Sequence, residues 1–142
     1  LRFCAVALVL AVCDRSGWGI SMKRILICGD RNWSDQRSIE AFVNLLPRDA
    51  VVIEGGAPGA DTLAGLCAIT AGLSLLVYPA DWRRYGRAAG PIRNAQMLDE
   101  GQPTEVHYFH DSIATSRGTA NMVRQAQKRG IPVFGHTSFG KE

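Results

Sequence analysis

The stretch from residue 51 to residue 64 constrains the fold more than any other part of the chain. Its β-branched apolar run, Val51-Val52-Ile53, leads into the glycine-rich turn Gly55-Gly56-Ala57-Pro58-Gly59, and a helical pattern follows at once. Glycine lets backbone N–H groups come close to an anion, and the start of a helix adds the positive end of its dipole. The turn has the spacing Gly-Gly-x-x-Gly and lacks the Lys-Ser/Thr ending of a P-loop. The stretch therefore predicts a strand, a turn and a helix, and the turn is interpreted either as an anion site or as a tight connection.

Strands and helices alternate along the rest of the chain. Apolar runs predict strands at residues 24–28, 50–53, 73–78, 105–109 and 131–134. Helical patterns follow the first four of these strands, and residues 79–90 are expected to form a long loop rich in arginine and aromatic side chains. The alternation is typical of an α/β fold, a three-layer domain with a central parallel sheet of about five strands. We expect the domain to cover residues 22–135 and a loose tail to cover residues 136–142.

Local signals predict where the helices begin, end and face. Ser34 is a suitable N-cap for the first helix, and Pro47 is expected to end it. Pro91 suits the first position of the helix that follows the long loop. One face of the second helix is expected to carry Leu63, Leu66, Cys67 and Thr70.

Residues 1–21 are a separate problem. Residues 3–13 form an unbroken apolar run that is too short to span a bilayer but has the length of a signal-peptide core. Against export, Arg2 is the one positive charge before this run, and Met22 leads straight into a predicted strand, as a natural start would. We interpret residues 1–21 as a non-native or mis-assigned extension, with a signal peptide or an anchor as the alternative.

Composition limits the classes of ligand. The net charge of +3 comes from 16 Lys and Arg against 13 Asp and Glu, an excess too small to argue for nucleic acid. A small anionic ligand fits better. Cys28 and Cys67 are expected to be small buried residues in a reducing, cytoplasmic compartment. His107 and His110 lie three residues apart on a predicted strand and face opposite sides, so we expect no metal site and no cofactor.

Four loops are expected to meet at one edge of the sheet. In parallel α/β sheets, ligands bind outside the carboxyl ends of the strands, near the point where the strand order switches. Residues 29–33, 55–61, 81–94 and 116–119 all follow predicted strands and therefore lie at that edge. Two of these loops open helices suited to phosphate, and in the last one Arg117 adds a forked cation. Two such sites suggest a diphosphate, although Ser116 and Thr119 also suit simple helix capping.

The remaining candidates have alternative interpretations. Asp61 is either a first-turn residue that favours the helix dipole, an acceptor for ribose hydroxyls, or a support for the loop. Asp81 is a similar ribose candidate, and Arg93 is either a ligand clamp or a surface arginine. Trp82 and Tyr85 either stack on a base or cover the edge of the sheet, and Trp33 has the same two interpretations.

The predicted site can be listed residue by residue. The ligand-binding candidates are Gly29, Asp30, Arg31, Gly55, Gly56, Gly59, Ala60, Asp61, Asp81, Trp82, Arg93, Asn94, Ser116, Arg117, Gly118 and Thr119. If the protein is an enzyme, the candidates for its acid or base are Asp30, Glu54, Asp61 and Asp81.

Four motifs follow one another along the chain. They are Ile25-Leu26-Ile27-Cys28-Gly29-Asp30-Arg31-Asn32-Trp33, Glu54-Gly55-Gly56-Ala57-Pro58-Gly59-Ala60-Asp61, Ala80-Asp81-Trp82 with Gly86-Arg87-Ala88-Ala89-Gly90-Pro91-Ile92-Arg93-Asn94, and Ser116-Arg117-Gly118-Thr119. Together they resemble the YspA-type, cpYpsA-related family of the SLOG superfamily. The resemblance implies a Rossmann-like fold that binds nucleotides or nucleotide-derived ligands. The superfamily includes cytokinin-activating phosphoribohydrolases and DprA-like DNA-processing proteins, and its members often occur in phage or bacterial conflict settings.

One branch of this superfamily carries a glutamate at a position where this chain has a different residue. The phosphoribohydrolases carry P-G-G-x-G-T-x-x-E, whose double glycine matches Ser116-Arg117 and whose glutamate matches Met122. The resemblance therefore implies binding without that branch's hydrolysis.

The sequence predicts a domain that binds a nucleotide-derived ligand, such as an ADP-ribose-like, NAD-like or other nucleoside phosphate, as a sensor or nucleotide-processing protein. One alternative is a hydrolase that cleaves an N-glycosidic or phosphoester bond. A further alternative is DprA-like DNA binding, which the weak net charge disfavours. The expected partner is a small molecule, with no membrane, and a homo-oligomer is left open.

Overall fold

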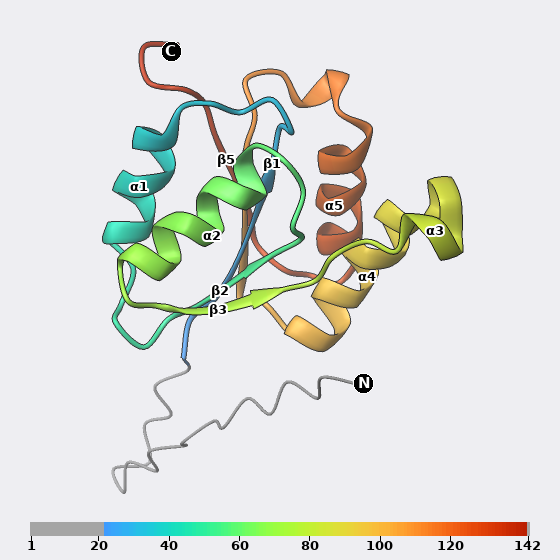
Figure 1. Ribbon diagram of the computed structural model, residues 1–142, viewed down its shortest axis with the longest axis horizontal. Helices are drawn as coiled ribbons and strands as arrows, with labels where there is room; N and C mark the ends of the chain where they lie inside the picture. The colour runs from blue at the N-terminus through green and yellow to red at the C-terminus, as the bar shows by residue number, and fades with distance from the viewer. Residues whose placement is uncertain (1–21, 142) are drawn as a thin grey trace, which may run out of the picture.

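The computed structural model describes residues 22–141, so the interpretation of residues 1–21 lies outside the described residues. Within residues 22–141, five strands are connected by helical segments, with α3 and α4 following one another between β3 and β4 (Figure 1). In order, the elements are β1 (Arg24–Gly29), α1 (Gln36–Asn44), β2 (Val51–Glu54), α2 (Ala60–Thr70), β3 (Ser74–Val77), α3 (Trp82–Tyr85), the 3₁₀ turn η1 (Gly86–Ala88), α4 (Ala89–Gly101), β4 (Glu105–Phe109), the 3₁₀ turn η2 (Ile113–Thr115), α5 (Arg117–Lys128) and β5 (Val133–His136).

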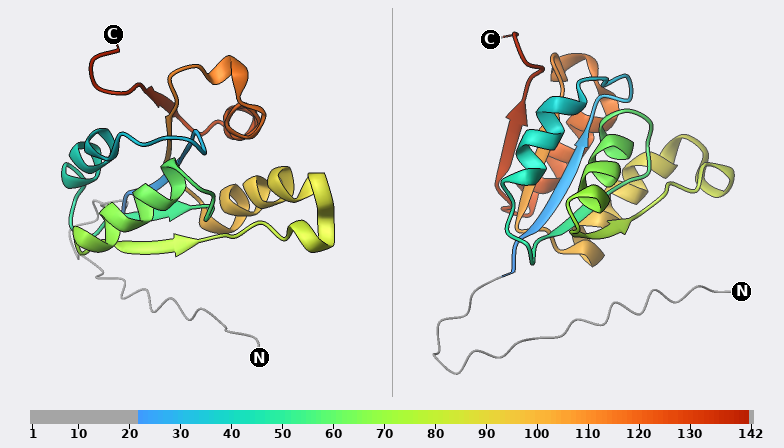
Figure 2. Two further views of the ribbon diagram at one scale, coloured as in Figure 1. Left: turned by 45° about the horizontal axis from the view of Figure 1, so that its top comes forward. Right: turned by 60° about the vertical axis from the view of Figure 1, so that its left-hand side comes forward.

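Helices cover both faces of one parallel sheet. Helices α1 and α2 lie on one face, and α4 and α5 lie on the other, as both views in Figure 2 show. The continuous apolar run of β1 follows from this, since neighbouring side chains point to opposite faces. Ile25 and Ile27 pack on the side of α1 and α2, whereas Leu26 and Cys28 pack on the side of α4 and α5. The predicted three-layer, Rossmann-like α/β fold with five parallel strands is confirmed.

The strand order β3-β2-β1-β4-β5 locates the switch in the sheet. The chain builds outward from β1 to β2 and β3, then returns and builds outward on the other side from β4 to β5. The loops that follow β1 and β4 therefore diverge to opposite faces. Gly29 pairs with Phe109 at the last position of this β1–β4 ladder, directly below the place where the two loops separate.

The prediction of a long loop between β3 and α4 is wrong. Residues 82–88 form the short helix α3 and the turn η1, and α4 begins at Ala89, two residues before Pro91. The carboxylate of Asp81 caps α3 by accepting a hydrogen bond of 3.1 Å from the backbone N–H of Arg84. The cap therefore stabilises a single helical turn. The arginine-rich sequence of this segment has no long apolar periodicity, so sequence patterns did not predict a helix here. The boundary of β5 also differs, because the strand extends to His136, which was assigned to the tail.

Two predictions about helices need correction. Asp35, not Ser34, caps α1, and its side chain accepts a hydrogen bond from the N–H of Ser38, while α1 ends at Asn44, before Pro47. The buried face of α2 consists mainly of small residues, Ala60, Ala64, Cys67 and Ala68, whereas Leu66 is 51% exposed and Thr70 is exposed. Small side chains let α2 lie close to the sheet. The prediction, which followed the large apolar residues, therefore identified the wrong buried face of this helix.

Three further side chains lie in the core. Cys28 and Cys67 are buried free thiols, as predicted, while Cys4 and Cys13 fall outside the described residues. Trp33 is buried and packs edge-to-face on Phe109, with 5.9 Å between the ring centroids. Trp33 is therefore a core residue. Within residues 22–141, we find no helix with the length and apolar character needed to cross a membrane.

Candidate functional site

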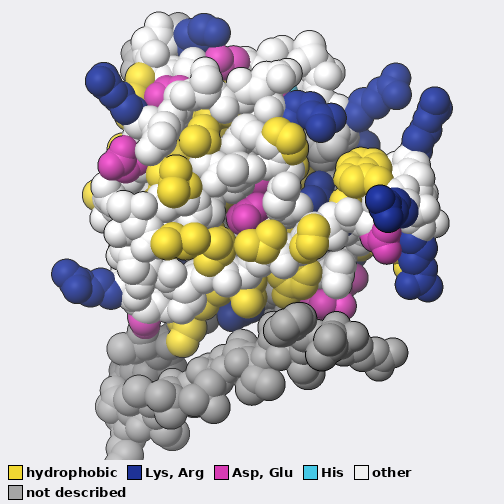
Figure 3. All heavy atoms as spheres, in the orientation of Figure 1, with side chains coloured by type: hydrophobic (Ala, Val, Ile, Leu, Met, Phe, Trp, Pro, Cys, Tyr) yellow, Lys and Arg dark blue, Asp and Glu magenta, His cyan; other side chains and the backbone are white. Residues whose placement is uncertain are grey.

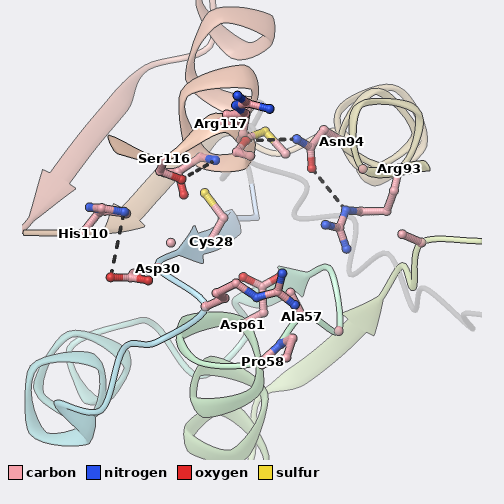
Figure 4. A pocket seen from close by; sticks show the side chains of 18 of the residues that line it. Cys28, Asp30, Ala57, Pro58, Asp61, Arg93, Asn94, His110, Ser116 and Arg117 are labelled. Atoms are coloured by element: carbon pink, nitrogen blue, oxygen red, sulfur yellow. Dashed lines mark hydrogen bonds and ion pairs between the residues drawn. The ribbon is translucent and has the colours of Figure 1, made fainter. Parts of the chain in front are cut away.

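A pocket of about 690 Å³ opens at the carboxyl edge of the sheet, where the loops after β1 and β4 diverge (Figure 4). All four loops expected at this edge contribute to its wall. The predicted residues that line it are Gly29, Asp30, Arg31, Gly56, Asp61, Trp82, Arg93, Asn94, Ser116, Arg117, Gly118 and Thr119. Those that do not are Gly55, Gly59, Ala60 and Asp81. Pockets that bind small molecules commonly have volumes of about 300–1,000 Å³, and the volume of this pocket lies within that range.

The glycine-rich turn is filled by a side chain of the chain itself. The Asp61 carboxylate accepts a hydrogen bond of 3.0 Å from the backbone N–H of Gly55, and the N–H groups of Ala57 and Asp61 also stabilise its charged form. The N–H of Gly56 donates to the side chain of Glu54, and the N–H of Ala60 donates to the carbonyl of Asp30. The N–H groups of Gly55, Gly56 and Ala60, which were expected to bind an anion at this turn, therefore already have partners. Of the three interpretations of Asp61, the geometry matches the loop support.

Glycine is needed here for contacts between backbone segments. A Cβ at Gly59, whose φ is +78°, would meet the backbone carbonyl groups of Asp30 and Arg31. A Cβ at Gly29 would meet the carbonyl of Phe109 and the side chain of Ala60. These glycines let the loop after β1 lie directly on the start of α2. The close approach that the sequence assigned to a ligand is made by the chain's own backbone.

Arg93 and Asn94 connect the two halves of the pocket. One terminal nitrogen of the Arg93 guanidinium donates to the carbonyl of Gly55, and its Nε donates to Asn94 Oδ1 at 3.1 Å. The amide nitrogen of Asn94 in turn lies 3.1 Å from Asn121 Oδ1 on α5. Asn94 is buried, and Figure 4 shows both side chains on one wall of the pocket. This network fixes α4 against the glycine turn and α5, and it leaves further guanidinium donors of Arg93 for a ligand.

The start of α5 keeps donors for an anion. Ser116 caps the helix, since its Oγ accepts a hydrogen bond of 3.1 Å from the N–H of Thr119, and the N–H of Ala120 bonds to the carbonyl of Ser116. Among the described residues, this leaves the first-turn N–H groups of Arg117 and Gly118 as the unpaired donors expected at a helix start. The exposed Arg117 side chain adds a positive charge beside them. Capping by Ser116 and an anion site at Arg117 and Gly118 are therefore compatible.

Two buried carboxyl groups lie close to the pocket. Burial raises the pKa of Glu54 to about 7 and that of Asp61 to about 6. For Glu54 the N–H of Gly56 opposes this rise, and for Asp61 the charge of Arg93 opposes it. Glu54 lies outside the pocket wall. Burial also raises the pKa of the Cys28 thiol, so this pocket-lining cysteine stays protonated and is a poor nucleophile.

The aromatic residues and the acid of the third loop have different roles. Asp81 caps α3 and is not among the residues that line the pocket, so the structure gives its side chain a capping role. Trp82 lines the pocket with 59% of its surface exposed, and Tyr85 is 40% exposed under the guanidinium of Arg84. Neither ring is buried over the edge of the sheet, and Trp82 is free to stack on a ligand.

His110 is a pocket residue that sequence reasoning missed. It follows β4 directly, is 8% exposed, and places its Nε2 3.9 Å from Oδ2 of Asp30, which follows β1. Asp30 and His110 are 80 positions apart, and only the pairing of β1 with β4 brings them together. The one available signal was the position of each residue immediately after a predicted strand. The described residues contain no cluster of His, Cys, Asp and Glu suited to a metal ion.

Met122 is the residue that the resemblance aligns with the glutamate of the phosphoribohydrolases. It lies one turn into α5, is 1% exposed and forms part of the pocket wall. Its thioether offers the ligand an apolar surface and no transferable proton.

Comparisons with known proteins agree with the fold and the motifs. A structural neighbour is the X-ray structure of DNA processing protein A (DprA) from Streptococcus pneumoniae, with a TM-score of 0.61 and 21% sequence identity. The match covers 80% of this chain and 50% of the DprA chain, so the two share a fold and this chain spans half the length of DprA.

Comparison of the sequence with known proteins also identifies the family. The gene 61 protein of Mycobacterium phage D29 is 35% identical over 122 residues, which cover 80% of this chain and 95% of the phage protein. The family model described as the YspA, cpYpsA-related SLOG family matches residues 23–85, which include the first two motifs and the start of the third. The resemblance noted on the motifs is confirmed, and the chain belongs to the YspA, cpYpsA-related SLOG family.

Proposed function

We propose that the pocket binds a nucleotide-derived ligand and that the phosphate of this ligand lies at the start of α5. The observation that carries the proposal is the set of donors there, the N–H groups of Arg117 and Gly118 beside the Arg117 guanidinium. They open on a pocket at the switch in strand order. Membership of the family supports a nucleotide-related role. ADP-ribose-like, NAD-like and other nucleoside phosphates all have this chemistry.

One phosphate position fits this pocket better than two. The glycine turn, the second position expected from the sequence, presents the carboxylate of Asp61 in place of free donors. A phosphate placed there would face a negative charge. Arg93 lies between the turn and α5, and its remaining donors are available to the sugar of the same ligand or to a further oxygen of the phosphate at α5.

A thermal-shift screen against a nucleotide library tests the proposal. The library contains nucleoside mono- and diphosphates, NAD and ADP-ribose. A ligand that binds only the folded state stabilises it by about 2.7 kcal/mol at a hundredfold excess over its dissociation constant. Stabilisation by at least one nucleotide, with none from the matching nucleoside, supports a phosphate-directed site. A library without any stabilising member contradicts the proposal.

Single-stranded nucleic acid is a second candidate, because arginine and aromatic side chains gather beside the pocket. Dark-blue side chains project from the side where α3 and the start of α5 lie (Figure 3). The exposed residues in this region are Trp82, Arg83, Arg84, Tyr85, Arg87, Arg117 and Arg124. A groove lined by Trp82, Arg87, Arg117 and Arg124 adjoins the pocket and shares part of its wall. Arginines that neutralise phosphates and rings that stack on bases are the usual components of such surfaces.

The two candidates respond differently to salt. Binding of a fluorescent single-stranded oligonucleotide through these arginines would weaken steeply as salt rises, since each phosphate contact releases counterions. Binding of a nucleotide in the pocket uses few charges and would weaken much less. Anisotropy titrations of both probes over a salt series therefore distinguish them, and an oligonucleotide affinity without a salt slope contradicts the second candidate.

A further inference from the structure

Asp30 and His110 form a donor–acceptor pair in the pocket wall with a gap between them. Figure 4 shows the two side chains facing each other on the wall opposite Arg93 and Asn94. Their nearest atoms, His110 Nε2 and Asp30 Oδ2, lie 3.9 Å apart. A direct hydrogen bond spans about 2.7–3.2 Å, so these two atoms do not satisfy one another.

The backbone fixes which atom of each side chain faces the gap. The N–H of Ser112 donates to His110 Nδ1 at 2.9 Å, so Nδ1 is the acceptor and the ring proton is on Nε2. The N–H of Asn32 donates to Asp30 Oδ1 at 2.9 Å, which turns Oδ2 toward His110. The gap is therefore bounded by one N–H donor and one carboxylate acceptor. Because His110 is 8% exposed, its ring has little freedom to turn away.

One oxygen atom that both accepts and donates satisfies this pair. An oxygen about 2.8 Å from each atom fits between groups that are 3.9 Å apart. A phosphate oxygen would face the Asp30 charge, and a base carbonyl has no proton to donate to it. An ammonium group or the exocyclic amino group of a base can donate to Asp30 but does not accept from the N–H of His110, because neither has an available lone pair. A hydroxyl group does both.

We propose that Asp30 and His110 bind a sugar hydroxyl of the ligand and thereby select ribose over deoxyribose. The inference rests on the proposed function, because the hydroxyl belongs to the ligand whose phosphate lies at the start of α5. Both groups line the same pocket. A site built to hydrogen-bond a hydroxyl rejects the analogue that lacks it, because the buried donor of His110 is then left without an acceptor. The selected ligand class is a ribonucleotide or ribose phosphate.

Sugar phosphates and nucleotides test the selection directly. The probes are ribose 5-phosphate and 2-deoxyribose 5-phosphate, together with ADP, 2′-deoxy-ADP and 3′-deoxy-ADP, measured by calorimetric titration on the full chain. We expect one of the deoxy forms to bind about 10- to 100-fold more weakly than its ribose counterpart, the range for hydrogen bonds to charged groups. The form that loses affinity identifies the hydroxyl that is bound.

A matched pair of histidine variants separates recognition from structure. In His110→Gln the amide nitrogen takes roughly the position of Nε2 and keeps a donor toward Asp30. In His110→Asn the amide oxygen takes roughly the position of Nδ1, which keeps the acceptor for Ser112 but removes that donor. We expect His110→Gln to retain part of the ribose preference, and His110→Asn and Asp30→Asn to lose it. Asp99→Asn, in an exposed ion pair with Arg129, is the control and should behave as wild type.

Three outcomes overturn the inference. If ribose and deoxyribose forms bind the wild-type chain equally well, the pair does not recognise the sugar, although the proposed function stands. If the ribose preference survives in His110→Asn and Asp30→Asn, the hydroxyl lies elsewhere. If no phosphate-bearing probe binds at all, the proposed function fails and this inference fails with it.

Discussion

The carboxylate of Asp61 occupies the turn in which an anion was expected, accepting a hydrogen bond of 3.0 Å from the backbone N–H of Gly55. The start of a helix and a glycine-rich turn attract negative charge from any source, including the chain itself. Here an aspartate in the first turn of α2 provides that charge. The turn is therefore a structural joint between β2 and α2, and the phosphate position that we propose lies at the start of α5 instead.

The first prediction concerns the stability of this joint. Replacing Asp61 by Ala leaves the buried N–H of Gly55 without its acceptor, so we expect the free energy of unfolding to fall by about 1–3 kcal/mol. Asp81→Ala is the matched control, since Asp81 caps only the four-residue helix α3. Chemical denaturation of both variants provides the comparison. An Asp61→Ala variant no less stable than Asp81→Ala would contradict the structural role.

The second prediction concerns the contact between the loop after β1 and the start of α2. Gly59 and Gly72 have similar positive φ angles, +78° and +73°, but a Cβ at Gly59 would meet the carbonyls of Asp30 and Arg31 while one at Gly72 has nothing within 4 Å. Gly72→Ala should therefore show only the backbone penalty of about 1–2 kcal/mol. Gly59→Ala should lose about 1–3 kcal/mol more, through the clash and because the ψ of −123° at Gly59 lies outside the left-handed α region. Equal melting temperatures would show that the two segments separate freely.

Much of the fold could be predicted from the sequence, because it depends on local patterns. The apolar runs of β1 and β4 identify strands covered on both faces, and the strand–helix alternation leads to one parallel sheet. The carboxyl edge then follows from topology alone, which is why most of the predicted site residues line one pocket. The short helix α3 was missed because its formation depends on one cap at Asp81 and not on periodicity.

The site itself could be predicted only in part. Asp61 could be located at the turn, but whether its carboxylate faces a ligand or the backbone depends on side-chain orientation. The pairing of Asp30 with His110 depends on the register of β1 against β4, which joins Gly29 to Phe109 and is invisible in the linear chain. Sequence patterns thus predicted which loops meet, and only the structure shows which atoms face each other.

The third prediction tests the phosphate position. Replacing Arg117 by Ala should weaken binding of ADP by about 1.5–3 kcal/mol, the contribution of a hydrogen bond to a charged group. Stability should hardly change, because the Arg117 side chain is exposed. Arg124→Ala is the control: it lies on the same helix and lines the adjoining groove but not the pocket. Calorimetric titration measures both affinities. Unchanged affinity together with lost stability would make Arg117 a structural residue.

The fourth prediction concerns the effect of pH on stability. His107 and His136 lie on the side of the sheet covered by α1, and their ring nitrogens are 2.9 Å apart. Burial lowers the pKa of both below 6.5. The unfolded chain then binds more protons than the folded one, so the histidine contribution is present above pH 6.5 and is lost as pH falls below it. Glu105, Lys23 and the ring of Phe42 surround His107.

Two variants separate the loss of stability that the histidines cause at low pH from the loss of stability that a buried carboxyl group causes at higher pH. The raised pKa of Glu54, about 7 against 4.5, stabilises the protein at low pH, and this contribution is lost as pH rises toward 7. Wild type should therefore lose stability relative to His136→Phe on acidification, and relative to Glu54→Gln as pH rises. Urea denaturation between about pH 5 and about pH 8 gives both differences. A flat difference for His136→Phe would contradict the histidine assignment.

The last prediction is that the protein binds nucleotides more readily than it cleaves them. Glycosidic cleavage needs an acid or nucleophile within reach of the reacting carbon. The position that carries a glutamate in the related hydrolases holds the buried side chain of Met122. Asp61 is bound to the Gly55 amide and Glu54 to that of Gly56, and Glu54 lies outside the pocket wall. Of the two carboxyl groups that line the pocket, Asp30 accepts from Asn32 through Oδ1 and keeps Oδ2 for a ligand. Its neighbour His110 directs a donor toward it, an arrangement suited to holding a hydroxyl.

Purified protein incubated with NAD, ADP-ribose and nucleoside monophosphates should therefore release little free base or ribose phosphate while it is stabilised by at least one of them. Chromatography of the incubated nucleotides and thermal shifts of the same samples provide the two readouts. Rapid turnover that disappears in Asp30→Asn or Asp61→Asn, while binding persists, would show that one of these pocket-lining carboxyl groups has replaced the missing glutamate. That result would convert the binding pocket into an active site with a relocated acid, at the same carboxyl edge of the sheet.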